Sequence, residues 1–497
     1  MVETSKQFYI NIEDKPYWNP TKPYDQQSRD AKQFMVEEAK KLKKGLNING
    51  VKIHPWLYWH VNFWNMMVDK KVEGNPLPIS VPEVAHLRDN EWLLQQSLIR
   101  SEELNKGIIG FGARRLGKEL ADYEPVITPK GEIPIGEIKV GDIAFGRDGK
   151  ETIVTHVFPQ GVKPIFRMYL LDGRYIDSGL DHQWTVITDK GERTYTTREL
   201  LGKKLSYNHK KSGKSYPFKL PECKPVQFPK KEFIIPPYLL GILLGDGKLG
   251  GGVPQFSSKD GEVNKYIQEC LSDEYVISTD INSKKSIGYD CSFYIKYIGN
   301  DKYKKDPKGH NPISREIKRL GLDGDFSKKF IPDEYKYASV EQRMELLRGL
   351  LDSDGSVNSE GCIEFSVKNE RLANDVSWLC RSLGIRCQQG YENLGWIEKE
   401  FPGGKVRNIY SEKWRVYIRT DLDVFKLERK RQRIKNRNRT SAVSIERIEY
   451  IGDHSATCIM VDNDDHLFLT KDFIVTHNSG FISSFTAFNA TTIYGGE

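Results

Sequence analysis

Residues Gly112–Leu120, GARRLGKEL, decide how this chain is divided into folding units. The first seven residues have the spacing G-x-x-x-x-G-K of a phosphate-binding loop, and the apolar run GIIGF at 107–111 suits the strand that leads into one. Such a loop continues with Ser or Thr, whose hydroxyl binds Mg²⁺, but this chain has Glu119. The phosphate-binding loop is therefore incomplete in this order of residues. One interpretation is that the chain is an intact nucleotide-binding protein with an unusual Glu at the end of the loop.

A second reading places the missing hydroxyl at Ser479. Joining Lys118 to Ser479 completes the loop and continues it into the apolar helix start GFISSF, so residues 119–478 are expected to be an insertion. The pair His477-Asn478 stands directly before the joint. An asparagine amide can attack its own backbone carbonyl and cut the chain as a succinimide, and a neighbouring imidazole can assist by proton transfer.

The composition indicates a globular protein of several domains. The chain has 497 residues, of which 38% are hydrophobic, and this length exceeds a single core. Its seven cysteines form no C-x-x-C pair, which excludes a zinc site and a disulfide framework and favours a reducing compartment. No signal peptide or membrane-spanning run is expected, and thus no membrane partner.

The net charge of +7 is concentrated in two segments. Residues 426–439, KLERKRQRIKNRNR, hold eight basic residues and one acid, and residues 202–219, GKKLSYNHKKSGKSYPFK, form a second basic segment. Each is either an ordinary solvated surface or a contact for nucleic acid.

Two kinds of sequence pattern alternate within residues 119–478. Residues 126–158 are short alternating runs separated by Gly-Asp and Asp-Gly turns, which predict an all-β unit, and residues 443–478 return to this pattern. Between them, PPYLLGILLGDG (236–247) and SVEQRMELLRGLLDSDG (339–355) predict two helices, each followed by a turn, a short strand and a lysine. The prolines of the first segment suit a first helical turn, and Ser339 and Gln342 of the second have the spacing of a capping box. This repeat predicts two pseudo-symmetric halves of one α+β domain. The expected boundaries are 1–118, 119–232, 233–430, 431–478 and 479–497.

Three segments of the regions predicted to be all-β resemble the motifs of inteins, which are protein segments that excise themselves. They are PVITPKGEIPIGEIKVGD (125–142), DHQWTV (181–186) and TCIMVDNDDHLFLTKDFIVTHN (457–478). The resemblance implies an all-β, horseshoe-like Hint splicing domain that acts on the flanking host segments in cis.

Most inteins begin with Cys or Ser, and Glu119 cannot replace either as a nucleophile. The chain is similar to class 3 inteins, which use a cysteine of the penultimate motif, here Cys458. It also has the other two markers of that group, Trp184 two residues after His182, and Thr476 before the terminal His-Asn. Taken singly, Cys458, Trp184 and Thr476 are equally typical of ordinary core residues.

The resemblance implies that Cys458 attacks the Lys118 carbonyl, forms a branched thioester and frees the Glu119 amine. His182 would protonate this amine or distort the scissile amide. Trp184 would pack beside Cys458 and position it, and Thr476 would orient the attack. No cofactor is expected.

Ser479 would then accept the host fragment, and Asn478, helped by His477, would release the insertion. His466 is either a further helper or a core histidine. The sequence departs from the family at one position. Gly179 stands three residues before His182, where inteins often have Thr, and Ser178 lies beside it. An alternative is a splicing-defective remnant that binds or nicks DNA.

The two predicted helices resemble the paired motifs of LAGLIDADG homing endonucleases, which are often nested in inteins. Gly241 and Gly349 would let the helices approach closely. Asp246 and Asp354 would meet at the negative helix ends, where a divalent cation such as Mg²⁺ relieves their repulsion. For a single Gly-Asp-Gly, a helix end and turn is the alternative.

The same resemblance assigns Lys329, in SKKFIPDEY (327–335), to polarise the attack, with Lys413 as its counterpart in the second half. The implied partner is double-stranded DNA, namely the host gene without the insertion, cut by a monomeric enzyme.

The restored loop GARRLGKS resembles the ATPase of phage terminase large subunits, an α/β P-loop NTPase. That resemblance assigns ATP and Mg²⁺ binding in the spliced host to Gly112, Gly117, Lys118 and Ser479. It also implies the cytoplasm of a phage-infected or lysogenic bacterial cell.

Overall fold

The computed structural model describes the part of the chain between Lys118 and His477, apart from short gaps, and a few residues before it. The described residues are 118–209, 213–250, 252–258, 260–279, 291–299, 311–401, 405–435 and 442–477, with 40, 44, 46–48, 51–53, 65–70 and 79–84. The chain divides into two compact units, Met1–Arg114 with Phe481–Glu497, and Arg115–Gly480. Four of the predicted site residues lie outside the described residues: Gly112, Gly117, Asn478 and Ser479.

The first unit contributes two short antiparallel pairs. They are β1 (Leu46–Ile48) with β2 (Val51–Ile53), and β3 (Asn65–Lys70) with β4 (Ile79–Val84). The second unit holds all the sites described below.

A β unit is built from two stretches that lie far apart in the sequence. The first stretch holds β5 (Leu120–Ala121), β6 (Pro125–Thr128), β7 (Gly131–Pro134), η2 (Ile135–Glu137), β8 (Ile143–Phe145), β9 (Glu151–Leu170), β10 (Tyr175–Gly179), β11 (Gln183–Thr188), β12 (Gly191–Thr196), α5 (Thr197–Leu201), β13 (Tyr207–His209), β14 (Gly213–Ser215) and β15 (Lys219–Pro221). The second holds β24 (Ala442–Val461), β25 (Leu467–Leu469), η5 (Lys471–Phe473) and β26 (Val475–His477).

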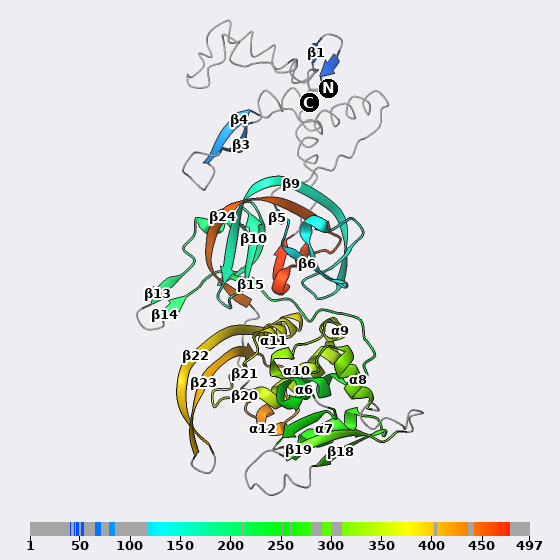
Figure 1. Cartoon of the computed structure of the whole chain (residues 1–497). Coiled ribbons are helices and arrows are strands. Elements are labelled where there is room, and N and C mark those ends of the chain that lie inside the picture. Colours follow the sequence, from blue (N-terminus) through cyan, green and yellow to red (C-terminus); the bar gives the residue numbers. More distant parts are fainter. Residues whose placement is uncertain are drawn as a thin grey trace. The chain divides into compact units, whose positions relative to one another are not determined.

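The main sheet of this unit has eight strands in the order β12-β11-β15-β24-β5-β10-β9-β8, and β24 also pairs with β9. The sheet therefore curls back on itself, and Figure 1 shows β9 and β24 curving side by side over the unit. Buried and exposed side chains alternate towards both ends of β9, as the alternating sequence predicts. Because β5 lies between β24 and β10, the start of the insertion is held by strands from both stretches.

The segment between the two stretches is a repeat unit of two similar halves. The first half runs α6 (Pro237–Asp246), β16 (Gly247–Lys248), β17 (Gln255–Ser258), α7 (Gly261–Cys270), β18 (Tyr275–Thr279), β19 (Cys291–Tyr297). The second runs α10 (Val340–Asp354), β20 (Gly355–Val357), β21 (Ile363–Val367), α11 (Glu370–Ser382), β22 (Arg386–Phe401), β23 (Lys405–Arg419). Their sheets are ordered β16-β17-β19-β18 and β20-β21-β23-β22, so the predicted pseudo-symmetry is present. The halves are joined by α8 (Pro312–Arg319), η4 (Phe326–Lys328) and α9 (Asp333–Lys336), and followed by α12 (Glu428–Arg431).

The helices α6 and α10 pack against each other through their glycines. A Cβ at Gly241 would lie 2.4 Å from the Leu346 carbonyl oxygen, and one at Gly349 would lie 2.1 Å from that of Tyr238. Both distances are too short for any larger residue, which confirms the predicted close approach. Ser339 and Gln342 form the predicted capping box at the start of α10, and a proline occupies the first turn of α6.

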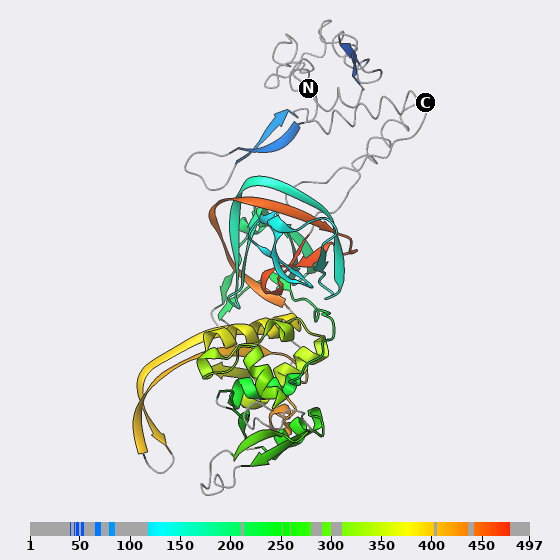
Figure 2. The same ribbon diagram turned by 45° about the vertical axis from the view of Figure 1, so that its right-hand side comes forward.

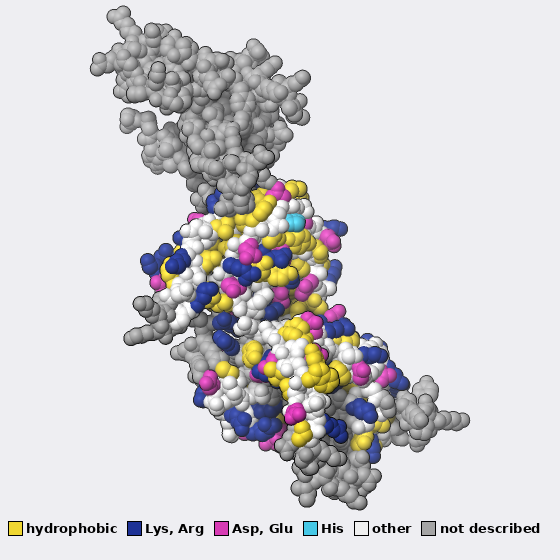
Figure 3. All heavy atoms as spheres, turned by 60° about the vertical axis from the view of Figure 1, so that its left-hand side comes forward, with side chains coloured by type: hydrophobic (Ala, Val, Ile, Leu, Met, Phe, Trp, Pro, Cys, Tyr) yellow, Lys and Arg dark blue, Asp and Glu magenta, His cyan; other side chains and the backbone are white. Residues whose placement is uncertain are grey.

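The second half differs from the first in its long hairpin. Strands β22 and β23 pair from Arg386↔Arg419 to Phe401↔Lys405, and Figure 2 shows them as a curved ribbon that extends beyond the helices. Trp396 on this ribbon is 73% exposed. On the face drawn in Figure 3, Lys and Arg side chains are spread over both the β unit and the repeat unit. In the described residues, no helix is both long and apolar enough to cross a membrane.

Candidate functional site

The first residue of the insertion lies between two strands that carry predicted site residues. The backbone N–H of Gly179, at the end of β10, donates to the Glu119 carbonyl at 2.9 Å. On the other side, Thr457 of β24 pairs with Leu120, so the next residues along these antiparallel strands are Cys458 and Glu119. The Cys458 side chain is fully buried. The strand pairing thus ends one residue before Cys458, the predicted nucleophile, and one residue after Glu119, which follows the peptide bond that the sequence predicts to be cut.

His182 joins this junction to the end of the insertion. Its Nε2 lies 2.6 Å from the Thr476 hydroxyl oxygen, and both side chains are fully buried. Trp184 packs against the imidazole, with the two ring centroids 4.5 Å apart. The indole N–H of Trp184 donates to the hydroxyl of Thr197 at 3.0 Å. Trp184 therefore holds the histidine in place, and its contact with His182 differs from the predicted role of packing beside Cys458.

The imidazole of His182 is neutral at pH 7. Burial lowers its pKa to about 3, and the positive charges of His477 and Lys118 act in the same direction, while hydrogen bonding to the Lys118 and Glu119 backbone opposes them. An imidazolium is therefore scarce in the folded protein near neutral pH. Of the two roles predicted for His182, holding the scissile amide fits this environment, whereas donating a proton to the leaving amine does not.

The other two predicted residues of the β unit, His477 and His466, are not fully buried. His477 ends β26, next to Thr476, and is partly exposed. His466 is exposed in the turn after β24, where its φ is 56° and its N–H donates to the Asn463 carbonyl. The alternative of a core histidine at His466 is therefore wrong.

The repeat unit brings its two predicted aspartates together at the ends of α6 and α10. A Cβ at Gly245, the neighbour of Asp246, would lie 3.4 Å from Asp354 Oδ2. Burial and the charge of Asp246 raise the pKa of Asp354, Lys329 and Lys430 oppose them, and the resulting pKa is about 6. Two carboxylates that repel each other at two negative helix ends form a place suited to a cation.

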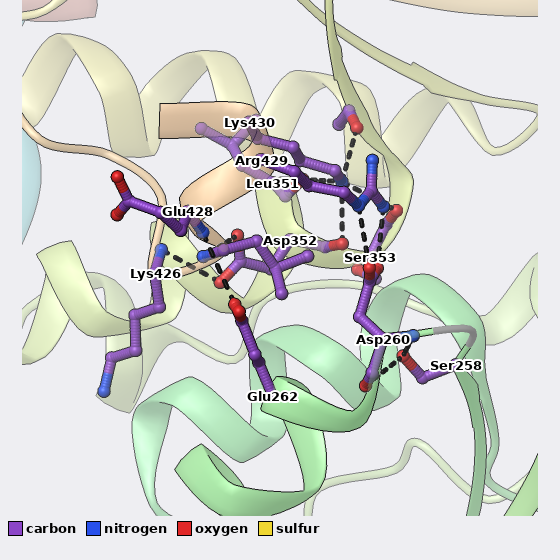
Figure 4. Close-up of polar contacts among 12 residues, drawn as sticks. Ser258, Asp260, Glu262, Leu351, Asp352, Ser353, Lys426, Glu428, Arg429 and Lys430 are labelled. Carbon is purple, nitrogen blue, oxygen red and sulfur yellow. Dashed lines mark hydrogen bonds and ion pairs between the residues drawn. The ribbon is translucent and has the colours of Figure 1, made fainter. Parts of the chain in front are cut away.

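Two buried lysines cover these helix ends. Lys329 Nζ donates to the Gly245 carbonyl at the end of α6, at 2.7 Å. Lys430 Nζ, on α12, donates to the carbonyls of Leu351, Asp352 and Gly355 at the end of α10, at 2.8, 2.7 and 2.7 Å. Figure 4 shows Lys430 beside Leu351 and Asp352. Burial lowers the pKa of both lysines, that of Lys430 to about 8.

Lys430 is thus the counterpart of Lys329, and the assignment of Lys413 to that place is wrong. Lys413 lies on β23 and contacts Glu392 at 3.5 Å. The resemblance had assigned Lys413, whereas Lys430 comes from the basic run 426–439, which the sequence left as either a solvated surface or a contact for nucleic acid. A signal for Lys430 was its place shortly after the apolar Phe425 and Leu427.

The described basic residues of that run are largely engaged within the protein. Arg429 forms two hydrogen bonds with Asp260, at 2.8 and 2.7 Å. Lys426 pairs with Glu345 at 2.7 Å, and Arg431 with Asp423 at 3.3 Å. Figure 4 shows Arg429 of α12 beside Asp260 of the first half of the repeat. These basic residues therefore form ion pairs within the protein and are not simply a solvated surface.

Asp246 and Asp354 could hold a divalent cation with help from solvent or substrate oxygens. Their carboxylates are hard oxygen ligands, and Mg²⁺ is typically bound by one or two protein carboxylates together with phosphate and water. Within the described part of the chain, no group of three or more His, Cys, Asp and Glu residues is placed to hold a metal ion.

Residues 341–392 match the family model described as a LAGLIDADG-like domain. The matched residues run from α10 into β22 and so lie within the second half of the repeat unit. The chain is also 28% identical, over 400 residues, to the replicative DNA helicase DnaB of Mycobacterium intracellulare. This similarity covers 73% of the chain and 59% of that protein.

Among solved structures, the chain is similar to inteins and to a homing endonuclease. The MchDnaB-1 intein is 36% identical over 15% of this chain and 57% of its own, with a TM-score of 0.14. The gp41-1 intein is 27% identical over 20% of this chain and 76% of its own, with a TM-score of 0.16. Variants of the homing endonuclease I-DmoI are 12% identical over 37% of this chain and 88% of their own, with a TM-score of 0.23. These TM-scores are low, and the likenesses by themselves establish no function for this chain.

Proposed function

We propose that residues 119–478 are a self-splicing class 3 intein that carries a DNA endonuclease. The observation that carries the splicing proposal is the register at the junction. Thr457 pairs with Leu120, and Cys458 and Glu119 are the next residues beyond this pair, with the Glu119 carbonyl accepting a hydrogen bond from Gly179 on the other side. Directly opposite residues of antiparallel strands lie close together with their side chains on the same face. In this proposal the Cys458 thiol therefore reaches the carbonyl that precedes Glu119.

The proposed reaction begins when the Cys458 sulfur bonds to the Lys118 carbonyl carbon and the bond from that carbon to the Glu119 nitrogen breaks. The thiol proton is lost and the nitrogen gains one. Ser479 then takes the host segment from the thioester as an ester. Asn478 cyclises and cuts the chain before Ser479, and an O-to-N acyl shift leaves a Lys118–Ser479 peptide bond. No cofactor is needed, because each bond broken is replaced by another of similar energy.

In the same proposal, the repeat unit cleaves double-stranded DNA at the host gene without the insertion. The matched LAGLIDADG-like domain and the paired aspartates support this activity. A Mg²⁺ ion bound there would supply water activation and stabilise the leaving oxygen. Asp246 and Asp354 would hold it, while Lys329 and Lys430 place positive charge beside the carboxylates. We propose a monomer because both halves of the site come from one chain.

We further propose that the host is a phage terminase ATPase in an infected or lysogenic bacterial cell. After splicing, Gly112, Gly117, Lys118 and Ser479 would form its ATP and Mg²⁺ loop. The support is the restored sequence GARRLGKS.

Expression of the full chain followed by mass spectrometry tests splicing. We expect a fragment of residues 119–478 and a ligated remainder of residues 1–118 with 479–497. Cys458→Ala should abolish the ligated product, whereas Cys380→Ala, a change at another fully buried cysteine, should leave it intact. Normal splicing by Cys458→Ala would refute the mechanism. If the unchanged chain yields no ligated product but binds or nicks the DNA target, the second candidate, a splicing-defective remnant, is correct.

A further inference from the structure

The Glu119 side chain occupies a place that only a glycine at position 179 leaves open. A Cβ at Gly179 would lie 2.2 Å from Glu119 Oε1 and 2.6 Å from its carboxyl carbon. This is the position at which related inteins often have Thr. The absence of a side chain at Gly179 therefore lets the Glu119 carboxyl fold against the strand beside the junction.

The carboxyl is held next to the nitrogen that must leave. Glu119 is 5% exposed, its Oε2 is buried without a hydrogen-bond partner, and its carboxylate accepts a hydrogen bond from the Glu119 backbone N–H. That N–H belongs to the Lys118–Glu119 peptide bond. Cys458 and Glu119 are the next residues beyond the Thr457–Leu120 pair, and residues that stand opposite each other on antiparallel strands share one face of the sheet.

We infer that the Glu119 carboxyl is the proton donor to its own backbone nitrogen when Cys458 displaces that nitrogen from Lys118. This inference rests on the proposed splicing and names a further catalytic residue for its first step. The carboxyl proton passes to the nitrogen as the bond between it and the Lys118 carbonyl carbon breaks. The thiol releases its proton as the new carbon–sulfur bond forms, and the carboxylate left after the nitrogen is protonated takes up one proton, so the acid is restored and the protons balance.

The surroundings keep the carboxyl suited to this role. Burial raises the pKa of Glu119, and the charge of Asp181 acts in the same direction, while the backbone hydrogen bond and Lys163 oppose it. His182, which faces the same junction, is neutral at pH 7 and cannot supply the proton as an imidazolium. Glu119, the first residue of the insertion, cannot act as a nucleophile, and it instead serves as the proton donor.

Glu119→Gln in the full chain tests the inference, because it keeps the shape but cannot deliver a carboxyl proton. We expect the branched thioester to form on the order of 10²-fold more slowly, the low end of general acid catalysis. The rate of the unchanged chain should fall as pH rises through the Glu119 pKa, and Glu119→Gln should lack this fall. Glu124→Gln alters another buried carboxyl and should leave the rate unchanged. Urea unfolding of each variant checks that it is folded.

A second pair of variants tests the geometry. Gly179→Ala should slow the first step as much as Glu119→Ala does, because its Cβ displaces the carboxyl, and the double variant should be no slower than either. An unchanged rate and pH profile in Glu119→Gln, in a chain whose Cys458 still forms the branched thioester, would overturn the inference and leave the proposed splicing intact. Absence of the thioester in the unchanged chain would overturn both.

Discussion

His182 and Thr476 are hydrogen-bonded at 2.6 Å although 294 residues separate them in the chain. The bond joins the strand region that holds the first splice junction to the residue that precedes His477-Asn478. The two ends of the insertion are therefore connected through one fully buried pair of side chains. This connection lets a change at either end affect the other.

Thr476→Val should weaken both the fold and the splicing. It keeps the shape but leaves a buried imidazole nitrogen without its partner, which costs about 1–3 kcal/mol of the free energy of unfolding. We expect slower thioester formation, measured by mass spectrometry of quenched samples, and a lower urea midpoint. Thr476→Ser retains the hydroxyl and should stay near the unchanged chain in both measurements. Equal losses in the two variants would contradict a role for the hydroxyl.

We expect the buried, neutral His182 to lower the free energy of unfolding of the β unit at acidic pH. The unfolded chain takes up this proton near pH 6.5, whereas the folded protein does so near pH 3, because burial lowers the pKa. Between these values the unfolded state binds more protons, so stability is full above pH 6.5 and is lost as the pH falls. Urea unfolding from pH 7.5 to 4 should show this slope, and His182→Asn should reduce it. An unchanged slope in the variant would assign the acid sensitivity to other groups.

Lys430→Met should impair DNA cleavage and loosen the end of α10. The change leaves three buried carbonyls without their donor, for which we expect a stability loss of about 1–3 kcal/mol. It also removes positive charge beside Asp354, and cleavage should fall at least about tenfold, which corresponds to about 1.4 kcal/mol of the activation barrier.

Lys413→Met is the matched control, since Lys413 pairs with Glu392 on the hairpin. Gel assays of a plasmid that carries the host gene without the insertion would measure both variants. If Lys413→Met lost cleavage and Lys430→Met kept it, the pairing of Lys430 with Lys329 would be wrong.

Asp354→Asn should separate DNA binding from DNA cleavage. Loss of one cation ligand is expected to reduce cleavage by about 10²-fold or more, because such an ion contributes several kcal/mol to the transition state. Chelation of divalent cations should abolish cleavage by the unchanged protein. Binding, followed by gel shift without divalent cation, should persist, and so should splicing. Full cleavage by Asp354→Asn would exclude this site as the metal centre.

Local patterns predicted much of the repeat unit. The glycines of α6 and α10, the capping box of Ser339 and the proline in the first turn of α6 all act within one helix turn or one helix contact. Interactions of this kind, between residues close together in the chain or in one helix contact, can be predicted from the order of residues. The pairing of two similar halves was visible for the same reason, since each half repeats a helix, a turn and a strand.

Other features depend on residues that are distant in the chain. The sequence could not distinguish Lys430 from Lys413, because only burial and three accepting carbonyls identify the buried lysine. It also left the basic run around Lys430 as either a solvated surface or a contact for nucleic acid, since composition does not reveal that Arg429 pairs with Asp260. The predicted partner of Trp184 was Cys458, but the folded chain places its ring against His182.

By itself, the sequence predicted a division at Lys118 and Glu119, because a broken motif and its completion at Ser479 are properties of residue order. It also determined that Glu119 is no nucleophile, which follows from covalent chemistry. Only the tertiary structure decided what surrounds Glu119: the strand of Cys458 on one side, Gly179 on the other and a neutral His182 nearby. Strand register sets which residues face one another, and burial sets their protonation, and neither exists until the chain folds.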